Sequence, residues 1–172
     1  MKKIFGHRGL PLVHMENSIT SLNAAFEYCD YVETDVRITA DNNLILFHNS
    51  DLNGKLIKDL TTREILSQLD DVHKDELILS TRDQIKGKVN FEIKTDSLLQ
   101  PQIDILFQKM LPILHPEDIV TSFNWKSLHL PNPISSIFLF SISDPYLMLI
   151  SSLFLNCFSN FAETFDKSVS GS

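Results

Sequence analysis

Short apolar runs alternate with amphipathic stretches through the first part of the chain. Ile4–His7 and Tyr31–Asp35 predict β-strands, and between them the apolar residues of Ile19–Phe26 recur at helical spacing. Asn17 or Ser18 is suited to cap that helix. Alternation of strand, helix and strand is typical of an α/β domain with parallel strands, and we predict that class here.

The third strand follows the second too closely for a crossover helix. Leu44–His48 begins directly after the polar turn Thr39–Asn43, whereas parallel pairing needs a connection of about a dozen residues or more. We therefore predict an antiparallel hairpin. Such a hairpin brings His48 back toward Glu33 and Asp35 on the second strand.

The alternation continues to about residue 140. Thr61, followed three residues later by Glu64, forms a capping box that predicts a helix start. The later predicted elements are a strand Val89–Lys94, a helix with apolar Ile103, Leu106, Phe107, Met110 and Leu111, and strands Asp118–Ser122 and Ser135–Phe140. Tyr146–Phe158 is apolar, but Asp144 and Pro145 precede it, which favours a buried strand and helix over a membrane span. We expect one domain over residues 1–172.

Composition narrows the classes of partner. The net charge is −7 and the Lys and Arg residues form no run, so a nucleic-acid partner is not expected. Cys29 and Cys157 are far apart and lack metal-ligand spacing, which argues against a disulfide framework and a zinc site. Free thiols and an amino end without a signal-peptide pattern favour the cytoplasm, without membrane contact.

Three acids mark a candidate metal site. Glu33 and Asp35 lie on one face of their strand because side chains alternate with period two, and Glu92 is near the end of another strand. Adjacent like charges repel unless a cation lies between them. Because hard oxygen ligands suit Mg²⁺ or Ca²⁺, we predict a divalent-metal site at these residues.

Two histidines and two cations lie on the same strand ends. His7 and His48 come from different strands, and imidazole exchanges protons near neutral pH, so the pair suits general acid and base catalysis. Arg8 binds phosphate oxygens in a bidentate manner, and Lys94 adds a point charge. Together these residues suit a small-molecule phosphate ester.

Five short motifs, in this order and at these distances, resemble those of the glycerophosphodiester phosphodiesterases. They are Gly6-His7-Arg8-Gly9, Glu16-Asn17-Ser18, Glu33-Thr34-Asp35-Val36, Phe47-His48-Asn49 and Phe91-Glu92-Ile93-Lys94. The resemblance covers roughly residues 4 to 140. It implies a TIM (β/α)8-type barrel that hydrolyses glycerophosphodiesters to glycerol 3-phosphate and an alcohol with a divalent metal.

The resemblance also implies a role for each residue of the site. His7 and His48 fall on the two catalytic histidines, and the metal ligands fall on Glu33, Asp35 and Glu92. Arg8 and Lys94 fall on phosphate contacts, whereas Glu16 and Asn17 belong to the motif that supports the loop of the first histidine.

The chain departs from the family pattern at three places. Asn49 stands where the family usually has Asp, and Met15 stands where it usually has Pro. Both residues are neighbours of functional groups, so the changes imply altered properties of those groups rather than loss of function. The family's closing strands have no counterpart before Ser172, so we expect a barrel that is incomplete at its carboxyl end. Open edges would favour self-association or a complementing chain.

Two other functions are compatible with the sequence. A truncated, catalytically inactive barrel could act as a binding or interaction protein. A related phospholipase of the same barrel class would act on intact lipid, which the apolar Tyr146–Phe158 segment would favour.

Overall fold

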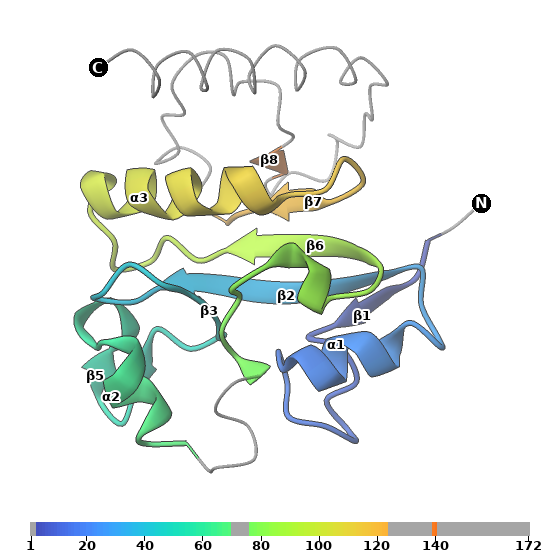
Figure 1. The fold of residues 1–172 in the computed structure, drawn as a ribbon, viewed down its shortest axis with the longest axis horizontal. Helices are drawn as coiled ribbons and strands as arrows, with labels where there is room; N and C mark the ends of the chain where they lie inside the picture. The colour runs from blue at the N-terminus through green and yellow to red at the C-terminus, as the bar shows by residue number, and fades with distance from the viewer. Residues whose placement is uncertain (1–2, 70–75, 124–138, 141–172) are drawn as a thin grey trace.

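The computed structural model describes residues 3–69, 76–123 and 139–140. Its centre is a mainly parallel sheet in the order β1-β2-β6-β7-β8, with β3 antiparallel to β2 (Figure 1). The strands of this sheet are β1 Phe5–His7, β2 Tyr31–Ile38, β3 Leu44–Leu46, β6 Lys88–Ile93, β7 Ile119–Thr121 and β8 Leu139–Phe140. β4 Asp51–Leu52 and β5 Lys55–Leu56 form a separate hairpin.

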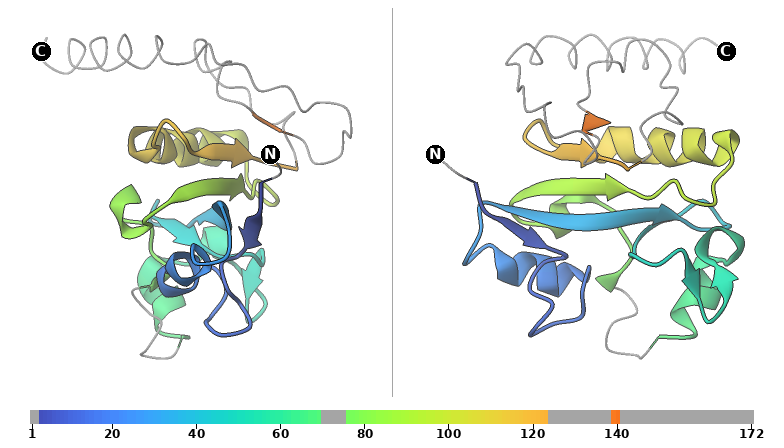
Figure 2. Two further views of the ribbon diagram at one scale, coloured as in Figure 1. Left: turned by 90° about the vertical axis from the view of Figure 1, so that its right-hand side faces the viewer. Right: turned by 180° about the vertical axis from the view of Figure 1, so that it is seen from behind.

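In the part of the chain that the structure describes, three α-helices connect or cover these strands. They are α1 Ile19–Ala25, α2 Thr62–Leu66 and α3 Gln100–Met110, and the short 3₁₀ turns are η1 Ile57–Asp59, η3 Arg82–Gln84 and η4 Leu111–Ile113. α1 and α3 contribute to one apolar cluster on the strands, with α1 near β1 and α3 near β7, as two further views show (Figure 2). The fold is therefore α/β with parallel strands, as predicted.

The core follows from the burial of β2 and of the helix faces turned toward it. Every residue of β2 from Val32 to Ile38 is buried. α3 buries four residues, Ile103, Leu106, Phe107 and Met110, in the same apolar cluster. Burying a large apolar side chain contributes roughly 1.5–3 kcal/mol, so this packing holds the strands that carry the site.

The predicted hairpin is confirmed. β2 and β3 pair antiparallel, with Val36 opposite Leu46 and Ile38 opposite Leu44. β2 extends beyond the predicted end at Asp35 because its last residues pair with β3. β3 is shorter than predicted and ends at Leu46, after which the chain leaves the sheet.

The helix starts agree with the capping residues in the sequence. Ser18 is the cap of α1, because its side chain accepts a hydrogen bond from the Ser21 amide. Thr61 and Glu64 form the predicted capping box at α2. Leu111, predicted in the helix of α3, instead begins the 3₁₀ turn η4.

The carboxyl-terminal predictions are mostly beyond the described residues. β8 falls within the predicted strand Ser135–Phe140, whose remaining residues lie outside the described part, as does Tyr146–Phe158. Within the described ranges, no helix has the length and apolar character needed to cross a membrane.

Candidate metal centre and adjoining pocket

Three carboxylates converge where β1, β2 and β6 lie side by side. Glu33 and Asp35 share a face of β2, and the parallel register places Asp35 opposite Glu92 of β6. One oxygen from each carboxylate lies within 4.8 Å of the others. The three residues are only 7%, 1% and 6% exposed, respectively.

The charged form of Glu33 is unfavourable in this cluster. Burial raises its pKa to about 7, and the neighbouring Asp35 charge adds to the increase, while a hydrogen bond from the Arg8 amide opposes it. Its Oε1 atom is buried and has no hydrogen-bond partner among the described residues. A buried acceptor without a partner costs about 1–3 kcal/mol. This carboxylate-only donor set with an unpartnered oxygen fits a divalent cation.

Lys94 lies against the same carboxylates. Its Nζ pairs with Glu92 Oε1 and lies 2.9 Å from Asp35 Oδ1. Burial would lower the pKa of Lys94, but the hydrogen bonds to Glu92 and Asp35 outweigh it and the pKa is raised. Lys94 is therefore a cation that already compensates part of the negative charge.

Arg8 follows β1 in an unusual backbone conformation. Its φ of 54° lies in the left-handed region, and its amide donates to Glu33 Oε2 at 3.0 Å. Its guanidinium places Nη1 3.1 Å from Glu16 Oε2 and Nε 3.2 Å from Asp35 Oδ2. The predicted phosphate-binding residue thus also organises the acids.

Gly9 permits this turn after β1. Its φ is +83°, and a Cβ atom there would lie 2.5 Å from the carbonyl carbon of Ser21. The Ser21 hydroxyl donates to the Arg8 carbonyl at 3.1 Å and accepts from the Leu10 amide at 2.8 Å. A residue with a side chain at position 9 would push the loop away from α1.

Asn17 supports the acids rather than capping α1. Its Nδ2 donates to Asp35 Oδ2 at 3.0 Å, and its Oδ1 accepts from the Asp35 amide at 3.1 Å and from Thr34 Oγ1 at 2.8 Å. Its φ of 62° lies in the left-handed region that Asn tolerates. The side chain therefore holds the Asp35 carboxylate and its backbone together.

The two histidines occupy different environments. His7, at the end of β1, is 70% exposed and places Nε2 3.8 Å from Glu33 Oε2. His48 follows β3, and its Nδ1 lies 3.0 Å from Asn49 Oδ1. Because an amide oxygen only accepts, Nδ1 of His48 is the donor and Nε2 is left for other partners.

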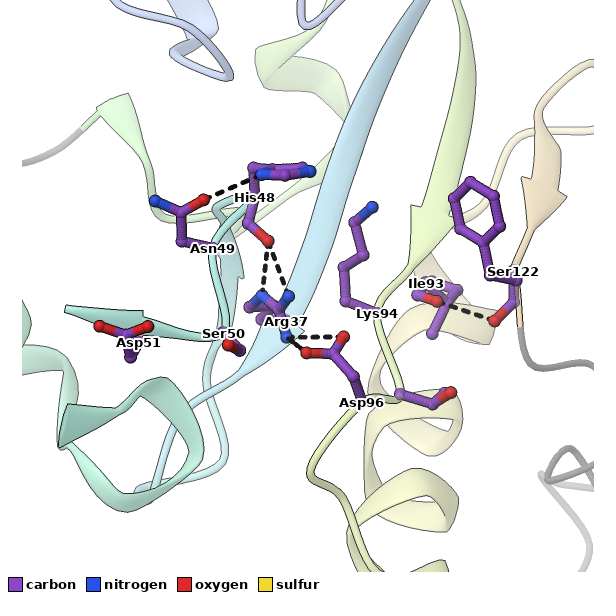
Figure 3. Close-up of a pocket in the computed structure, with 11 residues that line it drawn as sticks. Arg37, His48, Asn49, Ser50, Asp51, Ile93, Lys94, Asp96 and Ser122 are labelled. Atoms are coloured by element: carbon purple, nitrogen blue, oxygen red, sulfur yellow. Dashed lines mark hydrogen bonds and ion pairs between the residues drawn. The ribbon is translucent and has the colours of Figure 1, made fainter. Parts of the chain in front are cut away.

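A cavity of about 430 Å³ opens beside the acids, with His48 and Lys94 in its lining (Figure 3). The other lining residues are Arg37, Asn49, Ser50, Asp51, Ile93, Thr95, Asp96, Ser122 and Phe123. The acids are not among them, so the cavity and the cluster are neighbours joined by Lys94. A ligand that occupied the cavity and also reached the three carboxylates would therefore lie against Lys94.

Sequence reasoning missed several residues of this region. The buried Arg37 forms an ion pair with the exposed Asp96 at the cavity, and the available signal was a charged residue between Val36 and Ile38 in an apolar strand. Phe123, another residue of the cavity lining, has Lys94 Nζ 5.4 Å from its ring centre. This distance is that of a cation–π contact.

Relatives of known sequence match much of the chain. A glycerophosphodiester phosphodiesterase of Bacillus altitudinis is 28% identical over 151 residues, which cover 76% of this chain and 61% of that protein. An uncharacterized protein of Mycoplasma genitalium is 29% identical over 97 residues, or 56% of this chain and 36% of its own. The chain thus spans less than two thirds of each.

Solved structures agree in fold. A glycerophosphodiester phosphodiesterase from Parabacteroides distasonis superposes with a TM-score of 0.62 and 25% identity, covering 73% of this chain and 58% of that one. An Oleispira antarctica phosphodiesterase in complex with the product sn-glycerol-3-phosphate has a TM-score of 0.60 and 22% identity, over 74% and 60% of the two chains. These neighbours are TIM barrels, and this chain has their α/β fold over the shared part.

The family model of these enzymes matches a continuous stretch of the chain. The match runs over residues 7–126 and so includes all three acids, both histidines, Arg8 and Lys94. By this match the chain belongs to the glycerophosphoryl diester phosphodiesterase family.

Proposed function

We propose that the protein is a divalent-metal-dependent phosphodiesterase that hydrolyses glycerophosphodiesters to glycerol 3-phosphate and an alcohol. One observation carries the proposal: three buried carboxylates converge within 4.8 Å, and Glu33 Oε1 lacks a partner among the described residues. Membership of the family and the name of the Bacillus relative support the reaction. Cys29 has no disulfide partner among the described residues, which supports a reducing compartment, and the cytoplasm is the proposed location.

In this proposal Glu33, Asp35 and Glu92 hold the metal ion. Their hard oxygen atoms suit Mg²⁺ or Ca²⁺ better than a softer transition metal. When bound, such an ion supplies positive charge that stabilises the negative charge growing on the phosphate.

His7 and His48 share the proton transfers. One imidazole accepts the proton of the nucleophile, either water or the glycerol 2-hydroxyl, and the other donates a proton to the departing alkoxide. His48 presents Nε2 for this work, because its Nδ1 is bonded to Asn49. His7 lies beside Glu33 and is open to solvent, which leaves room for a substrate oxygen.

Arg8 and Lys94 bind the phosphate oxygens. The guanidinium of Arg8 contacts Glu16 and Asp35 through Nη1 and Nε, and Nη2 makes no hydrogen bond within the described residues. Lys94 lines the cavity and can bind a phosphate oxygen there. Glu16 and Asn17 support this arrangement through their bonds to Arg8 and Asp35.

The experiment is an assay of the purified chain with a panel of glycerophosphodiesters. Release of glycerol 3-phosphate is measured with Mg²⁺, with Ca²⁺ and with a chelator, and we expect turnover that the chelator abolishes. Glu92→Gln should abolish it too, whereas Glu117→Gln, the same change at an exposed acid paired with Lys88, should not. Turnover unaffected by the chelator contradicts the proposal, and metal binding without turnover would favour the inactive binding protein.

A further inference from the structure

A buried arginine lies next to the acids but does not contact them. Arg37 is on β2, two residues after Asp35, and is only 6% exposed. A buried guanidinium is costly unless its N–H groups find acceptors. The acceptors of Arg37 therefore show what its burial stabilises.

The donors of Arg37 go to two segments that flank the cavity. Nε and Nη2 both donate to the carbonyl oxygen of His48, at 3.0 and 2.7 Å. Nη1 lies 3.1 Å from each carboxylate oxygen of Asp96 (Figure 3). All three nitrogen atoms of the guanidinium are thus engaged.

Among the described residues, few other hydrogen bonds fix the backbone of His48. β3 ends at Leu46, and the Phe47 amide makes one more bond, to the Asp35 carbonyl at 3.0 Å. At His48 itself, the two bonds from Arg37 hold the carbonyl oxygen, while Asn49 holds the ring. The position of the imidazole therefore depends on Arg37 through the main chain.

Asp96 fixes the other end of this arrangement. It follows β6 by three residues, in the same segment as Lys94, and both line the cavity together with His48. Arg37 consequently ties the segment that carries His48 to the segment that carries Lys94. A change in the guanidinium would alter the separation of these two side chains.

We propose that Arg37 is a positioning residue that sets the placement of the His48 imidazole relative to the bound phosphodiester, with Asp96 orienting its guanidinium. The inference rests on the proposed function, and it adds a residue to that reaction. Arg37 touches neither the acids nor, in this account, the substrate; its effect passes through the His48 carbonyl.

The matched test is Arg37→Lys, which keeps the charge but replaces a fork of donors with a single point donor. We expect kcat to fall about 100-fold, because a displacement of about 1 Å can have that effect. KM and the affinity for Mg²⁺ should change little. Asp96→Asn, which keeps an acceptor for Nη1, should cause a smaller loss of kcat.

Arg82→Lys is the control, because it also replaces the guanidinium of a buried arginine with an ammonium group. Arg82 is 4% exposed and pairs with Asp118, with no contact to His48. This variant should unfold at a lower temperature while its folded fraction keeps the kcat of the original chain. An equal fall in kcat in both variants would mean that general destabilisation, not His48 placement, causes the loss, and would overturn the inference.

A readout without substrate separates this inference from the proposed function. With ¹³C-labelled histidine, the ring signal of His48, assigned by its loss in His48→Gln, should be single in the original chain and in Arg82→Lys. It should shift and broaden or split in Arg37→Lys. An unchanged His48 signal in Arg37→Lys overturns the inference, even where the original chain shows no turnover, a result that would overturn only the proposed function.

Discussion

At the amino ends of β6 and β7, Arg82 and Asp118 form a buried ion pair, whereas at the opposite ends of the strands three carboxylates face each other. Asp118 Oδ1 accepts from Arg82 Nη2 at 2.6 Å and from the Val89 amide at 3.1 Å. Its Oδ2 accepts from Arg82 Nε at 2.7 Å and from the His115 amide at 2.9 Å. Arg82 also donates to the carbonyls of Ile85 and Gly87.

The end of the strands that carries the three carboxylates lacks such a balance of positive and negative charge. Two cations, Arg8 and Lys94, pair with only two of the three acids, Asp35 and Glu92, and one oxygen of Glu33 has no partner among the described residues. Burial and the Asp35 charge raise the pKa of Glu33 to about 7. The comparison teaches that one end uses buried charge to hold strands together, while the other keeps a surplus of negative charge that a ligand can neutralise.

The largest expected effect is on stability at the amino end. Asp118→Ala leaves Arg82 buried without its carboxylate, and breaking such a pair costs about 3–5 kcal/mol. Urea unfolding followed by circular dichroism measures the loss. Asp59→Ala, at a more exposed pair with Lys58, should cost less than about 1 kcal/mol. Equal losses in the two variants would show that the Arg82 pair has no special role.

The next effect is on activity at the opposite end. His7→Ala and His48→Ala should each lower kcat by about 100-fold or more, because general acid and base groups contribute at that scale. His115→Ala, which removes an exposed ring 3.6 Å from Asp83 near the amino end, should leave kcat unchanged. Near-normal turnover in either of the first two variants would remove that histidine from the mechanism.

A smaller effect is expected at Glu33, where substitution should increase the stability of the metal-free chain rather than lower it. Its folded-state pKa of about 7 exceeds the ordinary value of 4.5, so the folded chain binds the proton more tightly than the unfolded chain. Without metal, stability should therefore fall as pH rises from about 4.5 to 7, and stay lower above that.

Glu33→Gln should remove this dependence and stabilise the metal-free chain at pH 8 by on the order of 1–3 kcal/mol. Thermal unfolding at pH 5 and pH 8 in the presence of a chelator measures both effects. Glu27→Gln, at an exposed residue, is the control and should preserve the slope. Destabilisation by Glu33→Gln at pH 8 would mean that the site is balanced without a cation.

Local patterns were sufficient to predict much of the carboxylate end. Period-two alternation placed Glu33 and Asp35 on one face, and the short turn after β2 specified the hairpin that returns the chain to the Asp35 carbonyl through the Phe47 amide. Ser18 or Asn17 was predicted as the cap, and the left-handed backbone of Asn17 sends its side chain to Asp35 instead. These features depend on residues close in sequence or on one strand pair.

Pairs between distant segments could not be predicted. Arg82 and Asp118 are separated by 36 positions, and Arg37 and Asp96 by 59, and neither pair has a local pattern. Their partners are decided by which strands become neighbours in the sheet. The exact strand ends were missed for the same reason, because β2 ends where its pairing with β3 ends.

The central claim is that the surplus carboxylates form a cation site, and calorimetric titration of the chain with Mg²⁺ and with Ca²⁺ tests it most directly. The account predicts that one ion binds per chain, that Asp35→Asn abolishes the binding and that Asp59→Asn, at an exposed acid outside the cluster, preserves it. Circular dichroism would confirm that both variants are folded. Equal binding by Asp35→Asn and the original chain, or no binding by the original chain, would contradict the account.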